Sequence, residues 1–320
     1  MVVPSLTYPE AVVIGLLQGV TELFPVSSLG HSVLLPAVIG GSWARDLNLG
    51  ADQSPYLAFL VAVHVATAAA LVWFFRADWV RIVRGLVTSV RDRRIIDADQ
   101  RLAWLLIVAT VPVGLAGLLL EHTVRTTLGK PLPASLFLII NGLLLAGVER
   151  LRGRTAQPRT PVPVALAEPG VYVGSTAQAG VSAAHGDVES DRRLAGLGWR
   201  QATVIGAAQI LALLPGISRS GVTMGAGLLR GLSHEDAARF AFLLATPVIA
   251  AAGVLKLPEL AGPAGRGVAG PVLVGSVVAG LAAYVSLRFL TRYFETRTLN
   301  PFAVYCIVAG LAGFAWFGMN

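Results

Sequence analysis

The chain has 320 residues, of which 55% are hydrophobic and only 13% are charged, and its mean hydropathy is +0.69. Soluble domains carry about 25% charged residues, so this composition excludes an ordinary soluble protein and indicates an integral membrane protein. The net charge of +7 does not predict a nucleic-acid partner, because the arginines lie between apolar runs and fit cytoplasmic loops beside anionic membrane lipids. The lone Cys306 excludes an intramolecular disulfide.

The first apolar stretch, residues 9–40, is interrupted at its centre by a polar turn, LFPVSSLGH (23–31). A second stretch, residues 199–232, is interrupted in the same way by LLPGISRSG (213–221). Each broken stretch is followed by three unbroken apolar runs of about 20 residues, the length that spans a bilayer. In chain order, the six runs cover about 55–76, 102–121, 133–150, 236–257, 268–290 and 300–319.

The two broken stretches are similar to each other in sequence. Five residues of the first stretch recur in the second at a constant offset of 191 residues. The matches pair Ile14, Gly15, Gln18, Ser27 and Gly30 with Ile205, Gly206, Gln209, Ser218 and Gly221. This similarity indicates an internal repeat, and since three spans follow each broken stretch, the second copy must be inverted in the membrane.

The predicted fold is therefore an all-α polytopic membrane protein with six transmembrane helices and two re-entrant broken-helix hairpins in an inverted repeat. The first repeat covers residues 1–152 and the second covers 199–320. The region between them, 153–198, is rich in Pro, Gly, Ala, Ser and Thr, and we expect a flexible cytoplasmic linker there.

Arginines gather in three regions, 76–101, 150–200 and 288–297, whereas the alternate loops contain few basic residues. The positive-inside rule places these three regions in the cytoplasm and both termini outside. One broken stretch then enters the membrane from each side, so the two polar turns can meet within the bilayer.

Non-helical backbone at membrane depth is tolerated only inside protein or beside a watery cavity, so we expect the two turns to line a polar cavity. Ionisable groups in such a place are candidates for function. The candidate side chains are Gln18, Glu22, Ser27, Ser28 and His31 from the first copy and Ser218, Arg219 and Ser220 from the second.

Helices that restart after each turn would aim the N–H groups near Gly30 and Gly221 into this cavity. Together with Arg219, these groups predict an anion site. The neighbouring carboxylate, imidazole and hydroxyl groups favour phosphate chemistry over passive binding.

Each candidate also has a purely structural interpretation. Glu22 could serve only as an ion partner for Arg219, Gln18 could bond between helices, and His31 could be a satisfied core residue. One of Ser27 and Ser28 is expected to cap the restarting helix. His64 lies alone in an apolar run, and we expect it to serve packing.

Several known catalytic signatures are absent from the sequence. There is no zinc pattern such as H-E-x-x-H, no cysteine beside Arg219 and no G-x-S-x-G elbow. The S-R-x5-H signature of some lipid phosphatases also fails, because Gly225 occupies the histidine position.

The motifs QGVTELFPVSSLGH and LLPGISRSGVTMGAGLLRG resemble the two signature regions of the bacterial undecaprenyl-diphosphate phosphatases, the bacitracin-resistance family. The resemblance covers the chain apart from 153–198. It implies an inner-membrane enzyme that removes one phosphate from a C55 polyprenyl diphosphate and so recycles the lipid carrier of peptidoglycan synthesis. Two residues depart from the family pattern, because Gln18 stands where a glutamate is also permitted and Leu29 replaces a threonine.

In the mechanism that we hypothesise, Arg219 binds two phosphate oxygens, and Gln18, Ser28, Gly30, Ser218, Ser220 and Gly221 complete the substrate site. Ser27 is the preferred nucleophile or phosphate ligand, with His31 as its base or as the acid for the leaving group. Glu22 orients that group or holds a divalent cation, Mg²⁺ or Ca²⁺, and no organic cofactor is expected.

Other functions stay open at this point. An inverted repeat with a central anion site also suits a polyprenyl-phosphate flippase, an anion transporter or a small-anion channel. The sequence also leaves open a covalent intermediate or direct attack by water, the metal, the chain-length preference and a homodimer.

Overall fold

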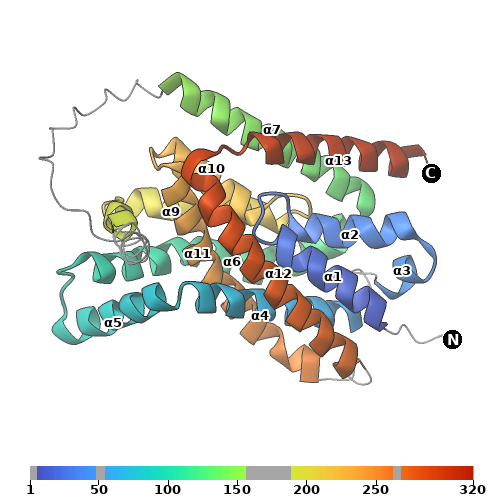
Figure 1. Cartoon of the computed structure of the whole chain (residues 1–320), viewed down its shortest axis with the longest axis horizontal. Helices are drawn as coiled ribbons and strands as arrows, with labels where there is room; N and C mark the ends of the chain where they lie inside the picture. Colours follow the sequence, from blue (N-terminus) through green and yellow to red (C-terminus); the bar gives the residue numbers. More distant parts are fainter. Residues whose placement is uncertain (1–5, 48–54, 156–188, 262–267, 320) are drawn as a thin grey trace, which may run out of the picture.

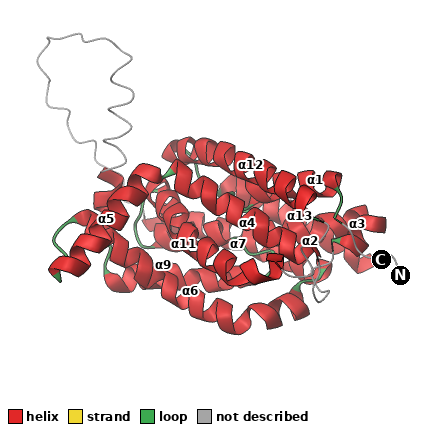
Figure 2. Cartoon of the chain, turned by 90° about the horizontal axis from the view of Figure 1, so that it is seen from below, coloured by secondary structure: helices red, strands yellow, loops and turns green. Residues whose placement is uncertain are grey.

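The computed structural model describes residues 6–47, 55–155, 189–261 and 268–319, and the regular structure in these residues is helical (Figures 1 and 2). The first half contains α1 (Tyr8–Thr21), α2 (Ser28–Ile39), α3 (Gly41–Asp46), α4 (Pro55–Phe74), α5 (Arg76–Asp92), α6 (Ala98–Leu128) and α7 (Pro131–Thr155). The second half contains α9 (Trp199–Ala208), the 3-10 helix η1 (Gln209–Leu213), α10 (Arg219–Leu229), α11 (His234–Ala261), α12 (Ala269–Thr296) and α13 (Asn300–Met319).

Within the described residues, six helices are long and apolar enough to cross a membrane, namely α4, α6, α7, α11, α12 and α13. This confirms the all-helical class and the six predicted runs. With 31 residues, α6 extends beyond its apolar run at both ends. The Asp97 side chain caps its N-terminus by accepting a hydrogen bond from the Gln100 N–H at 2.8 Å.

Each broken stretch forms two α-helices on either side of a turn, and in the second stretch the 3-10 helix η1 precedes the turn. The α1–α2 pair extends inward from the end of the molecule at which α13 finishes (Figure 1). The α9–α10 pair extends inward from the opposite end, which α5 also occupies (Figure 1). As a result, the two polar turns lie in the interior, where most of their residues are buried.

The first helix of each pair packs against the middle span of the other half, α1 on α12 and α9 on α6. Glycine allows both backbones to approach closely. A Cβ added to Gly15 would lie 2.3 Å from the Gly275 carbonyl oxygen, and one added to Gly206 would lie 1.9 Å from the Ala109 carbonyl oxygen. Gly15 and Gly206 are an equivalent pair in the sequence repeat, so the repeated glycines perform the same packing role.

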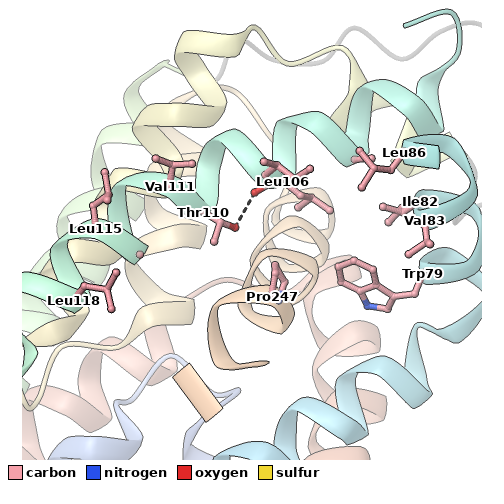
Figure 3. Close-up of a pocket in the computed structure, with 13 residues that line it drawn as sticks. Trp79, Ile82, Val83, Leu86, Leu106, Thr110, Val111, Leu115, Leu118 and Pro247 are labelled. Atoms are coloured by element: carbon pink, nitrogen blue, oxygen red, sulfur yellow. Dashed lines mark hydrogen bonds between the residues drawn. The ribbon is translucent and has the colours of Figure 1, made fainter. Parts of the chain in front are cut away.

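Residues 76–101, expected to be a loop, contain the helix α5. Arginines alternate there with exposed apolar side chains such as Val80, Val83 and Val87, a pattern typical of a helix lying at a membrane surface. An open apolar groove of about 410 Å³ lies between α5, α6 and α11 (Figure 3). Its lining of leucine, valine and isoleucine is compatible with contact with lipid tails.

The predicted linker is too long at both ends. Residues 153–155 continue α7, and residues 189–195 are helical, with Asp191 buried. Asp191 accepts hydrogen bonds from Arg81 at 2.6 Å and Arg239 at 2.9 Å. Arg193 donates to Asp236 at 2.8 Å, which raises the pKa of Arg193. The composition of residues 189–195 suggested a linker, but ion pairs to distant helices fix these residues in place. The rest of the predicted linker, 156–188, lies outside the described residues.

Candidate functional site

The two polar turns contact each other. The Ser27 Oγ accepts a hydrogen bond from the Gly216 N–H at 3.2 Å, which joins the first turn to the second. A Cβ added to Gly30 would lie only 2.9 Å from the Gly216 Cα, so this close approach requires glycine at position 30. The predicted meeting of the turns is thus confirmed.

The equivalent residues Ser27 and Ser218 are both N-caps. The Ser27 Oγ accepts from the Gly30 N–H at 3.3 Å, and the Ser218 Oγ accepts from the Gly221 N–H at 3.2 Å. Ser27 has φ 71°, a left-handed conformation that costs a residue other than glycine about 1–2 kcal/mol. The predicted cap is therefore Ser27, and its buried hydroxyl is engaged by two backbone N–H groups.

Glu22 is the centre of the site. It follows the last residue of α1 and is 8% exposed. Its carboxylate pairs with the Arg219 guanidinium and accepts a hydrogen bond from the Ser28 hydroxyl. The Gln18 amide, one helical turn before Glu22, donates to the same carboxylate at 2.9 Å. Because Arg219 begins α10, this ion pair connects the first broken stretch to the second.

His64 does not serve packing alone, contrary to the prediction. Its Nε2 lies 3.4 Å from a Glu22 carboxylate oxygen, while its Nδ1 lies 2.7 Å from the Leu60 carbonyl oxygen. The residues around His64 in α4 are apolar, so the local sequence suggested a packing role. The contact depends on the packing of α4 near the end of α1, which the local sequence does not reveal.

His31 is held at both ring nitrogens. Its Nδ1 lies 2.7 Å from the Ser27 carbonyl oxygen, and its Nε2 lies 2.7 Å from the Tyr305 hydroxyl. A carbonyl oxygen can only accept, so Nδ1 carries a proton and the chemistry of His31 is left to Nε2. The Tyr305 ring also stacks on the imidazole, with the ring centroids 5.7 Å apart.

The other predicted residues of the second turn bond to the first turn. The hydroxyl groups of Ser218 and Ser220 both donate to the Phe24 carbonyl, at 3.4 and 3.2 Å. The buried Asn141 on α7 joins the two turns, because its amide donates to the Pro25 carbonyl and accepts from the Ser218 N–H, each at 3.0 Å. In this arrangement Ser218 and Ser220 hold the turns together, while the Gly221 N–H is taken by the Ser218 cap.

Asn141 and Tyr305 were not among the site residues predicted from the sequence. Each is a polar residue within an apolar run, in the segments LIINGLL and FAVYCIV. A polar side chain at such a position in a spanning helix is a recognised sign of function or of helix association, and this signal could have identified both.

The residues around Glu22 offer a limited donor set for a metal ion. The described part of the chain contains no group of three or more His, Cys, Asp or Glu residues placed to hold a metal. Near Glu22 there are one carboxylate, the imidazole of His64 and the amide of Gln18, whose Oε1 is buried without a hydrogen-bond partner. This set fits a cation only if substrate oxygens supply further ligands, as is usual for Mg²⁺.

Comparison with known proteins identifies the family. The model of the family "Bacitracin resistance protein BacA" matches residues 11–312, which include both turns, the first five spans and most of α13. The chain belongs to this family.

Several curated relatives are similar to this chain over nearly their full length. The chain is 60% identical to an undecaprenyl-diphosphatase of Mycolicibacterium paratuberculosis, over 98% of this chain and 99% of the relative. It is 54% identical to undecaprenyl-diphosphatase 1 of Frankia casuarinae, with 98% and 99% covered. It is 41% identical to undecaprenyl-diphosphatase 2 of Burkholderia orbicola, with 97% and 96% covered.

Proposed function

We propose that this protein is an undecaprenyl-diphosphatase of the bacterial cell membrane. It hydrolyses undecaprenyl diphosphate to undecaprenyl phosphate and inorganic phosphate, which recycles the lipid carrier for peptidoglycan synthesis and confers bacitracin resistance. Family membership and 60% identity to a relative of that name support the activity. The observation that carries the proposal is the buried cluster in which Arg219 and Ser28 both contact Glu22.

Arg219 is the phosphate-binding group of the proposed site. A guanidinium offers a planar pair of donors that matches two phosphate oxygens, and its charge is permanent. In the structure this group pairs with Glu22, so the cation has a partner before the diphosphate arrives. Its side chain is 20% exposed, which leaves part of it accessible to an incoming anion.

In this proposal the nucleophile is Ser28 and not Ser27, which was the preferred residue from the sequence. The Ser27 hydroxyl caps α2 and is 3% exposed, whereas the Ser28 hydroxyl donates directly to the Glu22 carboxylate. A hydroxyl bonded to a carboxylate is the arrangement of a nucleophile and its base. The Ser28 oxygen would attack the terminal phosphorus, its proton would pass to Glu22, and the bond to the bridging oxygen would break. Water would then release the phosphate from Ser28.

His31 supplies the second proton-transfer group. With Nδ1 bonded to the Ser27 carbonyl, its Nε2 can give a proton to the departing lipid phosphate or take one from the attacking water. In either role, His31 and Glu22 would transfer different protons of the reaction.

A divalent cation is compatible with this proposal. Glu22 and the Oε1 of Gln18 would hold it together with oxygens of the diphosphate, and the ion would neutralise phosphate charge. Because Gln18 replaces a second carboxylate, we expect this chain to bind the ion weakly without substrate.

The arrangement of the helices supports an inverted repeat with re-entrant hairpins. The α1–α2 and α9–α10 pairs enter from opposite ends and meet at their turns (Figure 1). The first residues of α1 and the last of α13 lie at one end, and the arginine-rich α5 lies at the other end in both views (Figures 1 and 2). By the positive-inside rule, the α5 end faces the cytoplasm and both termini face outward.

The direct test is phosphate release by the purified protein in detergent with undecaprenyl diphosphate as substrate. We expect turnover without any membrane, and its loss in the Arg219→Ala variant. A protein that releases no phosphate in detergent, yet moves polyprenyl phosphate across the bilayer of reconstituted vesicles, would instead be a flippase or transporter.

A further inference from the structure

The Tyr305 hydroxyl on α13 is hydrogen-bonded to Nε2 of His31, the ring nitrogen that is left for proton transfer. The Nδ1 of His31 donates to the Ser27 carbonyl at 2.7 Å, so it cannot also exchange a proton with substrate. The Tyr305 hydroxyl lies 2.7 Å from Nε2, and the two rings stack within 10° of parallel. While this hydrogen bond is in place, a proton that enters or leaves Nε2 passes through the phenol oxygen.

A phenol suits this position in both protonation states of the imidazole. It donates its O–H to a neutral Nε2, and its oxygen accepts from the N–H of a protonated Nε2. The hydrogen bond is therefore maintained while its direction reverses, and the ring of His31 stays in place during the proton transfer.

Tyr305 lies at the edge of the site and not in its buried interior. The residue is 47% exposed, whereas the Glu22, Ser27 and Ser28 side chains are buried. The rings of His31 and Tyr305 come from opposite halves of the chain, so their contact forms only when α13 packs beside the first turn.

We propose that Tyr305 is a proton-relay residue of the hydrolase, the hydroxyl that holds His31 and through which the Nε2 of His31 exchanges its proton. The inference rests on the proposed function. In the transfer, the phenol gives its proton to Nε2 while its oxygen takes a proton from the reacting water. The phenol is regenerated, and one proton has moved from the water to His31.

A double-mutant cycle tests the proposal through activity. Tyr305→Phe keeps the ring stack and removes only the hydroxyl, and we expect kcat for undecaprenyl diphosphate to fall about tenfold with KM within twofold. In a His31→Gln background, the same substitution should change kcat by less than twofold, because Tyr305 acts through His31. Tyr284→Phe on α12, whose ring packs edge-on against Phe74 at 5.7 Å, is the matched control and should leave kcat unchanged.

The proposal is overturned if Tyr305→Phe leaves kcat unchanged or raises it, or if it lowers kcat equally in both backgrounds. A spectroscopic measurement separates this failure from failure of the proposed function. In protein labelled with ¹⁵N-histidine, the His31 signals are assigned by their absence in His31→Gln. Tyr305→Phe should shift the Nε2 signal and leave the Nδ1 signal in place, whatever the substrate. An unshifted Nε2 signal would show that the hydrogen bond is absent and would also overturn the proposal.

Discussion

The two broken stretches share their helix caps and their glycine packing, but they contribute site side chains of different charge. In both, a serine caps the restarting helix by accepting from the glycine N–H three residues later, and an earlier glycine packs on the opposite half. The first stretch contributes the carboxylate and the imidazole, Glu22 and His31, and the second contributes the guanidinium of Arg219. A repeated sequence can thus supply a symmetric scaffold while unmatched residues supply the two halves of one site.

The stretches also differ in where the backbone takes a left-handed conformation. In the second turn this residue is Gly216, with φ 115°, which glycine adopts without penalty. In the first turn it is Ser27, with φ 71°, and the hydrogen bond from Gly216 helps to hold it there. The first turn therefore depends on the second for its shape, and strain of this kind is common at functional sites.

The largest effect is expected for the cation of the second stretch. Arg219→Lys keeps the charge beside Glu22 but removes the planar pair of donors that matches phosphate. We expect kcat to fall by on the order of 10²–10³-fold, the size of a lost transition-state contact, with little change in thermal stability. Retained activity in the purified variant would reduce Arg219 to a counter-charge for Glu22.

The matching change in the first stretch is Glu22→Gln, which keeps the shape of the side chain and removes its charge. We expect kcat to fall by on the order of 10²-fold, because Ser28 loses its base. Unlike Arg219→Lys, this variant should also melt at lower temperature, because the partly buried Arg219 loses its ion partner. Phosphate release and thermal unfolding of both variants in one detergent provide the comparison, and equal melting temperatures would contradict the importance of the pair for stability.

The shared frame can be tested at the equivalent glycines Gly15 and Gly206. An alanine at either position would place its Cβ within 2.3 Å of a carbonyl oxygen of the opposite half, and we expect each to cost about 1–3 kcal/mol. Gly114→Ala is the control on α6, because its added Cβ meets no atom within 4 Å, and it should stabilise by about 0.5–1 kcal/mol. Denaturation of the three variants in detergent measures this, and a tolerated Gly206→Ala would show that the two stretches are not packed alike.

Much of this comparison could be predicted from the sequence, because hydrophobic length, the spacing of the repeat and the turn residues are local properties. They predicted the six spans, the two turns and the grouping of Gln18, Glu22, Ser28 and Arg219. The contacts of Glu22 with His64 and of His31 with Tyr305 could not be predicted, since they depend on how distant helices pack. The helix α5 was not predicted for another reason. Arginines between two apolar runs are also typical of a loop, but the apolar residues of α5 recur at helical spacing.

The smallest effect is expected where the two halves are joined. Residues 160–186 are rich in Pro, Gly, Ala, Ser and Thr, and longer or shorter connections change loop-closure entropy only slightly. We expect their deletion to leave phosphate release within about threefold, an effect of about 0.7 kcal/mol on the barrier. The deletion stops before residue 189 because Asp191 bonds to Arg81 and Arg239.

The matched variant for that deletion is Asp191→Asn in the full-length chain. It removes no residue but takes the negative charge from between Arg81 and Arg239, and the loss of a buried ion partner is strongly destabilising. We therefore expect Asp191→Asn to lower the melting temperature more than the deletion of 27 residues does, since 160–186 spans that number. If the deletion instead abolishes activity in a protein that still folds, residues 160–186 take part in function, and the two repeats alone do not form the complete enzyme.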